Sequence, residues 1–188
     1  MTCKKMLFSA FLLFQPHHGL PHNLDTVKCW SSTDKLTWSD FQGSVPKEML
    51  KSNRMAVCPS QIKIESVRNK TSIQFKVKVI FLKNQAWTKD TVSLNTLAHE
   101  QLHFDITELN ARKIRKSIDN LKAKKVTDFS QYQLTIQKFV SENERMQAEY
   151  DKQTNHGGYE DHQAEWREKI SNELNSLKSF SSAAKDCE

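Results

Sequence analysis

Glycine and proline are scarce in this chain of 188 residues, at four each, and cysteine is equally rare. The scarcity of glycine and proline excludes collagen-like chains and Pro/Gly-rich disordered chains. Four cysteines are too few for a small scaffold held together by many disulfides. No run of about 18 apolar residues occurs, so the sequence offers no ordinary membrane-spanning helix. The length therefore predicts one domain with a sizeable core, with or without short appendages.

The chain is polar and basic, with 27% charged residues, 37% apolar residues and a net charge of +6 at pH 7. Acidic residues are interleaved with basic ones along most of the sequence. Only the stretch from Arg112 to Lys125 is densely basic, and no aromatic-rich platform accompanies it. We interpret this stretch as a solvated helix face and expect no nucleic-acid binding.

Residues 1–22 have the pattern of a secretory signal segment. Lys4 and Lys5 precede Met6–Phe14, which is apolar apart from Ser9. This apolar run has the length of a signal-peptide core and is too short to cross a bilayer as an ordinary helix. We therefore expect a secreted or periplasmic protein with no transmembrane span in the mature chain.

Export would place the cysteines in an oxidising environment, where disulfides form. Cys29 and Cys58 flank the first β-like region and are one possible pair. Pairing of either with Cys187 stays equally open on the sequence.

The first half of the chain has the residue pattern typical of β-strands. Gln61–Arg68 and Ser72–Leu82 alternate apolar and polar residues, and a short turn separates them, which predicts a hairpin. The aromatic-rich segment Leu36–Phe41 is expected to form a first strand.

The second half has helical spacing. Apolar residues recur at that spacing from Ser93 to about Ala123 with no glycine or proline, which predicts a long helix. Asp128 or Ser130 can cap a second helix to about Tyr150, and a third begins near Asp161. The predicted class is α+β: a small N-terminal antiparallel sheet, a long helix and two further helices. We expect the domain to span residues 23–178 and a polar tail to span 179–188.

The long predicted helix contains His99-Glu100-Gln101-Leu102-His103, an HExxH motif. Residues four apart on a helix share a face, so His99 and His103 can converge on one ion. Zinc suits imidazole nitrogen and tolerates an open coordination position. Glu100 then lies beside the metal, where it can take a proton from the zinc-bound water as general base. The motif predicts a Zn²⁺ cofactor and a zincin-like fold.

A catalytic zinc site usually has three protein ligands, and the near continuation of the motif offers no third histidine. We predict His156 as the third ligand, because it stands in a loop that turns at Gly157, and Asp151 as its support. The alternatives are Asp151 itself, Glu144, Glu149 and His162. Asp105 follows the motif closely enough to orient a ligand histidine.

Three other side chains near the predicted loop are candidates to stabilise a developing oxyanion: Tyr150, Tyr159 and His162. Gln163 and Trp166 share a helix face with that loop, and we expect them to pack it.

Three separated motifs resemble one known family. They are LTWSDFQG at Leu36–Gly43, HEQLHFDITELNAR at His99–Arg112, and YDKQTNHG at Tyr150–Gly157 followed by Gln163 and Trp166. Together they are similar to a bacterial family of predicted secreted zinc-dependent proteases in the HExxH superfamily, formerly a domain of unknown function. The resemblance covers roughly Leu36 to Ile170. It implies metallopeptidase ancestry with a zinc helix and a signal peptide, and the HExxH roles for His99, His103 and Glu100.

The motifs and the resemblance predict an exported zinc metallopeptidase that hydrolyses a peptide or protein substrate. The alternative is a binding or scaffold protein on a protease-like fold that does not catalyse. Zinc content measured together with turnover of casein separates the two.

Overall fold

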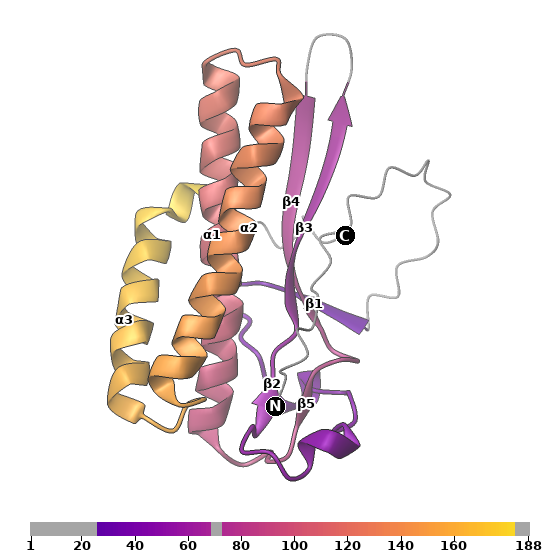
Figure 1. The fold of residues 1–188 in the computed structure, drawn as a ribbon, viewed down its shortest axis with the longest axis vertical. Coiled ribbons are helices and arrows are strands. Elements are labelled where there is room, and N and C mark those ends of the chain that lie inside the picture. Colours follow the sequence, from indigo (N-terminus) through magenta and orange to yellow (C-terminus); the bar gives the residue numbers. More distant parts are fainter. Residues whose placement is uncertain (1–25, 69–72, 183–188) are drawn as a thin grey trace, which may run out of the picture.

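A computed structural model gives the structure of residues 26–68 and 73–182 (Figure 1). Short strands and single helical turns come first, and three long helices follow. The predicted α+β class, with an antiparallel sheet before the helices, is confirmed. The signal segment predicted at residues 1–22 lies outside the described residues.

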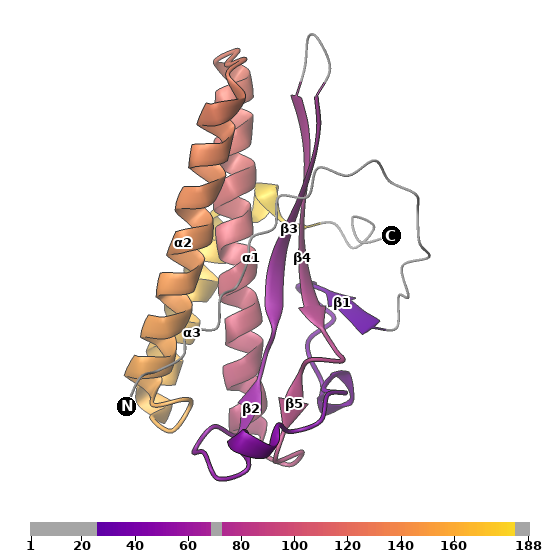
Figure 2. The same cartoon turned by 45° about the vertical axis from the view of Figure 1, so that its right-hand side comes forward.

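The main sheet contains β1 (Val27–Cys29), β4 (Ile73–Leu82) and β3 (Ser60–Arg68), in that order. β3 and β4 are antiparallel, with Ser60 opposite Phe81 and Arg68 opposite Ile73, so the predicted hairpin is confirmed. A second, two-stranded sheet pairs β2 (Ala56–Val57) with β5 (Trp87–Thr88). Figure 2 shows this small sheet beside the first turns of the long helix α1 (Leu94–Ala123).

The prediction of a strand at Leu36–Phe41 is wrong. Trp38–Asp40 instead form a single 3-10 turn. The carboxylate of Asp40 accepts hydrogen bonds from the backbone N–H and the hydroxyl of Thr37, at 2.9 and 3.0 Å. Such local bonds from a side chain to the backbone compete with the ladder of a strand, which explains the turn.

The three predicted helices are confirmed as α1 (Leu94–Ala123), α2 (Phe129–Thr154) and α3 (Glu160–Ser176). The Ser93 hydroxyl accepts the N–H of Thr96 and caps α1. Asp128 caps α2 by accepting the N–H of Ser130. α2 continues past its predicted end at Tyr150 and stops at Thr154, where Asn155 turns left-handed with φ of 48°.

Helix α1 lies between the sheet and the other two helices (Figure 2). On one side Phe104 and Ile114 join the core cluster that includes Phe81 of β4. On the other side Ile106 and Leu109 join a second cluster of buried residues from α2 and α3. Burial of each large apolar side chain contributes about 1.5–3 kcal/mol, so α1 is fixed from two directions.

The basic stretch of α1 is only partly the solvated face that the sequence predicted. The Arg112 side chain is buried and donates to Glu108, which is fully buried. Arg115 also donates to Glu108 and to the backbone of Phe180. The hydroxyl of Ser182 completes the cluster by donating to Glu108 at 2.8 Å. The start of the polar tail predicted at 179–188 is therefore bound to α1.

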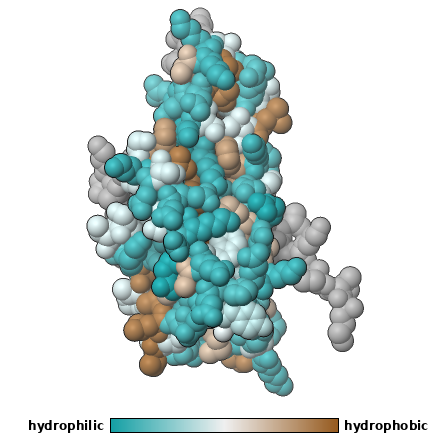
Figure 3. All heavy atoms as spheres, turned by 90° about the vertical axis from the view of Figure 1, so that its left-hand side faces the viewer, coloured by the Kyte–Doolittle hydropathy of each residue, from teal (hydrophilic) through white to brown (hydrophobic). Residues whose placement is uncertain are grey.

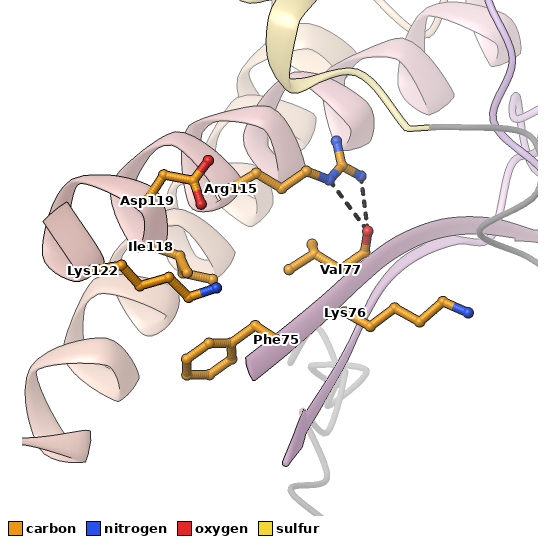
Figure 4. A pocket seen from close by; sticks show the side chains of 7 residues that line it. All are labelled: Phe75, Lys76, Val77, Arg115, Ile118, Asp119 and Lys122. Atoms are coloured by element: carbon orange, nitrogen blue, oxygen red, sulfur yellow. Dashed lines mark hydrogen bonds between the residues drawn. The ribbon is translucent and has the colours of Figure 1, made fainter. Parts of the chain in front are cut away.

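A cavity of about 190 Å³ lies where the far part of β4 diverges from α1 (Figure 4). Phe75 and Ile118 line it, and Arg115 reaches across to the carbonyl of Val77 at 3.1 and 3.2 Å. The guanidinium of Arg115 is already bound to β4. We therefore interpret the cavity as a gap between α1 and β4 that the Arg115 side chain bridges, and not as a ligand site.

The outer face of the helical layer is largely hydrophilic, with small hydrophobic groups at its upper and lower ends (Figure 3). Within the described part of the chain, no helix combines the length and apolar character that crossing a bilayer requires.

The possible pairing of Cys29 with Cys58 is wrong, because Cys29 is disulfide-bonded while Cys58 is a free thiol. β1 carries Cys29 on one edge of β4, opposite Ile80, whereas β3 follows Cys58 on the other edge. The central strand therefore separates the two cysteines. Cys187 lies outside the described residues.

Asp40 supplies the first testable prediction, because its buried carboxylate accepts from Lys28 at 3.1 Å and lies 3.4 Å from Lys83. Burial acts to raise the pKa of Asp40, but the Thr37 N–H and the Lys28 ammonium outweigh it and hold the pKa below the ordinary 3.8. Asp40→Asn should lower the free energy of unfolding by roughly 3 kcal/mol at pH 7. The carboxylate stabilises the fold only while ionised, so the loss should shrink as the pH falls below 3.8 and through the lower folded pKa.

Urea unfolding across a pH series measures this effect. Asp34→Asn is the matched control, because Asp34 bonds the same Lys28 but is 72% exposed. The control should cost less than about 1 kcal/mol. Equal losses in both variants, or a loss that persists at acid pH, would contradict the prediction.

Candidate metal centre

Two imidazoles and one carboxylate converge where α1 and α2 meet. His99 and His103 are four residues apart on α1, and their Nε2 atoms lie 3.1 Å apart. Asp151, near the end of α2, places Oδ1 at 3.2 Å from His99 Nε2 and 3.1 Å from His103 Nε2. Among the described residues these three form the group that could hold a metal ion.

Two glutamines fix which nitrogen of each imidazole carries the proton. The Gln163 amide donates to Asn95, so its Oε1 is left to accept from His99 Nδ1 at 3.2 Å. The Gln147 amide donates to the carbonyl of His103 and leaves its Oε1 to accept from His103 Nδ1. Because both Nδ1 atoms donate, both Nε2 atoms of the neutral rings present lone pairs to the cluster.

Three lone-pair atoms facing one another need a shared positive partner, because mutual repulsion otherwise opposes the arrangement. Zinc bonds of about 2.0–2.1 Å in tetrahedral geometry separate neighbouring ligand atoms by about 3.3 Å. The observed separations of 3.1 to 3.2 Å match that value closely. The donor set and its outer hydrogen bonds to the glutamine amides therefore fit a zinc ion.

The electrostatics of the cluster distinguish its members. Burial lowers the pKa of His99. Burial also acts to lower the pKa of His103, but Asp151 and Glu100 outweigh it and raise the pKa. Burial acts to raise the pKa of Asp151, but when the imidazoles are protonated their Nε2–H groups donate to Oδ1, and these bonds lower the pKa far below its ordinary value. The carboxylate thus stays ionised and attracts a positive charge to the cluster.

Tyr150 forms a platform under both imidazoles. Its ring stacks on His99 at 4.6 Å between centroids and meets His103 edge-on at 4.9 Å. The ring is fully buried and also packs against Trp166. This packing holds the imidazole planes in position between α1, α2 and α3.

The turn after α2 closes against His99 and requires a glycine. Gly157 has φ of +85°, and a Cβ atom there would lie 3.1 Å from Cγ of His99. The carbonyl of Gly157 accepts a hydrogen bond from Asn95 at 2.9 Å. Only a residue without a side chain lets the backbone approach the imidazole this closely.

Glu100 is 4% exposed, and its carboxylate accepts a hydrogen bond from the backbone N–H of Cys58, which follows β2 directly. Burial raises its pKa to about 7, while His103, Arg54 and the backbone N–H of Cys58 act in the opposite direction. Its carboxylate is therefore within electrostatic reach of the cluster without belonging to the converging group.

Arg54 and His156 also contact Asp151, and neither belongs to the converging group. Arg54 Nη2 is 3.3 Å from Oδ2, the oxygen turned away from the imidazoles. His156 Nδ1 is 3.1 Å from Oδ1, and both side chains are partly exposed, at 42% and 32%. These two groups are where the cluster opens toward solvent.

The structure exchanges the positions predicted for His156 and Asp151. Asp151 lies in the converging group, and His156 contacts Asp151 from outside it. The physical reason is the length of α2: Gln147 and Asp151 are four apart on one helical face, which meets His103 and His99. His156 comes after the helix end, in a left-handed conformation with φ of 54°.

The other predicted ligands lie elsewhere. Glu144 is exposed, and Glu149 binds Arg145 on the solvent side of α2. Asp105 does not orient a ligand histidine, because its carboxylate accepts from the Trp30 indole at 2.6 Å and from Gln101 at 2.9 Å. Asp105 instead fastens the N-terminal segment to α1.

The three predicted oxyanion stabilisers lie in two different surroundings. Tyr150 is buried beneath the imidazoles, where its hydroxyl lies 3.4 Å from Gln163 Oε1. Tyr159 and His162 contact each other and line a shallow surface hollow at the start of α3. His162 does not belong to the group of described residues that could hold a metal ion.

Sequence reasoning missed Gln147 and Arg54, and it expected Gln163 only to pack. Gln147 and Asp151 form a polar stripe at helical spacing beside apolar Met146 and Tyr150. That stripe is a signal that the second helix faces the HExxH helix with polar atoms. No comparable pattern in the sequence marks Arg54.

Comparison with known proteins bears on the central part of the chain. Residues 71–157 match the model of a family described as bacterial protein of unknown function (DUF922). The match contains the HExxH helix and extends through Asp151 to Gly157. No curated protein and no solved structure matches the chain significantly.

The exchange of His156 and Asp151 generates a prediction about zinc affinity. We expect the protein to bind about one zinc ion. Asp151→Ala should weaken zinc affinity at least about 100-fold, because a converging donor atom is removed, while His156→Ala should cost about 10-fold or less. Competition with a chromophoric chelator measures the affinities, and Glu149→Ala on the outer face of α2 is the control. A larger effect of His156→Ala, or no zinc binding by the parent protein, would show the assignment to be wrong.

A second prediction concerns the glutamine that holds His103. Gln147→Leu keeps the side chain similar in volume but removes the acceptor of His103 Nδ1. Zinc affinity should fall about 10–100-fold. Gln137→Leu, an exposed substitution on the same helix, should leave the affinity unchanged. Equal affinities for both variants would exclude an orienting role for Gln147.

Proposed function

We propose that the protein is an exported zinc-dependent metallopeptidase that hydrolyses peptide bonds. His99, His103 and Asp151 hold the zinc ion, and Glu100 is the general base. The architecture we propose is zincin-like: an antiparallel sheet covers one side of the HExxH helix and two helices cover the other.

The observation that carries this proposal is the convergence of three lone-pair atoms beside a buried glutamate. His99 Nε2, His103 Nε2 and Asp151 Oδ1 lie within 4.8 Å of one another. Glu100 is adjacent in sequence to one of these residues but is turned toward β2 and Cys58. A purely structural zinc site is usually closed by four protein ligands. A group of three beside an acid favours catalysis.

Zinc bound in this way supplies a Lewis acid and lowers the pKa of a water molecule. The chain's own residues do the remaining work. Glu100 accepts a proton and later delivers it to the leaving amine. Gln147 and Gln163 hold the imidazoles in the tautomer that presents Nε2, and Tyr150 excludes water from beneath them.

Export rests on residues 1–22 of the sequence and is supported by the disulfide bond of Cys29, since disulfides persist in oxidising compartments. A peptide or protein is the proposed substrate. A non-catalytic binding protein on the same fold is the alternative, and it would carry zinc without turnover.

Glu100→Gln tests the proposed function. Glutamine keeps the shape of the side chain but cannot accept the proton, so zinc content should be retained while hydrolysis falls by about 100- to 10,000-fold. Release of fluorescent peptides from labelled casein measures turnover, and elemental analysis measures zinc.

Glu149→Gln on the outer face of α2 is the matched control and should hydrolyse casein like the parent protein. Hydrolysis by Glu100→Gln at the parent rate would refute the general-base role. Zinc binding with no hydrolysis by the parent protein would favour the non-catalytic alternative.

A further inference from the structure

Arg54 stands at the open side of the candidate metal centre. Its guanidinium lies 3.3 Å from the outer oxygen of Asp151, while the inner oxygen faces the imidazoles. Its charge also reaches Glu100 and acts on the pKa of that carboxyl group. With 42% of its side chain exposed, Arg54 faces both the cluster and solvent.

Arg54 uses few of its hydrogen-bond donors, unlike the arginines that stabilise the fold. Arg115 donates to Glu108, Val77 and Phe180. Within residues 26–68 and 73–182, the structure gives Arg54 a single hydrogen bond for its five N–H donors. The remaining donors are free to bind an incoming acceptor.

The backbone around Arg54 is held in place. The carbonyl of Met55 accepts the N–H of Lys89 at 2.8 Å, and the Lys89 ammonium binds the carbonyl of Ser52 at 2.8 Å. β2 begins directly afterwards at Ala56 and pairs with β5. A fixed backbone reduces the conformational entropy that is lost when a ligand binds. Arg54 is therefore better positioned for binding than an arginine on a loose surface segment.

The open guanidinium fork has a defined chemical preference. Its planar N–H groups match the two oxygens of a carboxylate, and such charge-assisted pairs are stronger than neutral hydrogen bonds. Asp151 offers Arg54 only one oxygen at a long distance, because its other oxygen is engaged with the histidines. A zinc ion beside Arg54 would add positive potential and favour an anionic ligand further.

We propose that Arg54 binds a carboxylate of the substrate next to the metal centre. Building on the proposed function, this names the substrate class as peptides that carry a carboxylate close to the bond that is cut. The carboxylate belongs either to an acidic side chain or to a free C-terminus, since both present the same pair of oxygens.

The test measures peptide binding in zinc-loaded Glu100→Gln protein, which separates recognition from turnover. Three fluorescent peptides share one neutral sequence: the first is capped at both ends, the second is capped but carries a central glutamate, and the third has a free C-terminus. The capped neutral peptide should bind about tenfold more weakly than at least one carboxylate peptide. Which of the two binds more tightly identifies the source of the carboxylate.

Substitutions of Arg54 then show whether this residue causes the preference for carboxylate peptides. Arg54→Gln should remove the tenfold advantage, and Arg54→Lys should restore part of it, because lysine keeps the charge but lacks the fork. Arg145→Gln is the matched control, since Arg145 also pairs with carboxylates but lies on the exposed face of α2. It should leave the preference intact.

Three results would overturn the proposal: no measurable peptide binding, equal binding of all three peptides, or a carboxylate preference that survives Arg54→Gln. In the last case, a zinc affinity reduced as far as in Asp151→Ala would show that Arg54 acts only by positioning Asp151. Casein hydrolysis by the parent protein is scored separately. Carboxylate preference without hydrolysis defeats the proposed function alone, whereas hydrolysis without the preference defeats the proposal for Arg54 alone.

Discussion

Three lone-pair atoms approach to within hydrogen-bond distance of one another at the junction of α1 and α2, and this approach is unfavourable by itself. His99 Nε2, His103 Nε2 and Asp151 Oδ1 repel unless a proton or a cation lies among them. Holding them together requires rigid support from outside the cluster. α1 provides it through burial on two sides, and α2 returns antiparallel so that its last turns reach the start of α1 (Figure 1).

Much of the surrounding packing serves this same approach. Tyr150 fills the space under both imidazoles, and Gln147 and Gln163 satisfy the Nδ1 atoms. Gly157 lets the turn after α2 close directly on His99. α3 contributes Gln163 and Trp166, so it takes part in shaping the site and not only in covering the core. Loss of any of these contacts would leave an imidazole free to rotate away.

The sequence predicted the parts of the molecule that periodicity encodes. The β3–β4 hairpin follows from alternation of apolar residues, and α1 follows from an apolar pattern without a helix breaker. Leu36–Phe41 was misjudged because a local bond from Asp40 to Thr37 outweighs the strand character of its aromatic residues. The possible pairing of Cys29 with Cys58 failed because sequence spacing does not reveal that β4 lies between them.

Within the site, the pattern that a single helix encodes was predictable, and contacts between elements were not. The spacing of His99 and His103 specifies a shared face. The choice between Asp151 and His156 depends on where α2 ends, and helix ends are poorly encoded when the residue beyond the last turn is asparagine rather than glycine. Arg54 reaches the site because β2 lies beside α1. No local sequence pattern predicts that these two elements are neighbours.

Two carboxylates share this site, and their surroundings push them into different chemical states. Glu100 is sealed against β2, where burial raises its pKa to about 7. Asp151 lies within 3.2 Å of both imidazoles, and hydrogen bonds from the protonated rings overcome its burial and depress its pKa. A carboxylate that remains ionised suits a permanent ligand, whereas one that exchanges its proton near neutral pH suits an acid or base. The surroundings of the two carboxylates therefore agree with the roles we propose for them, Asp151 as a ligand and Glu100 as the group that moves the proton.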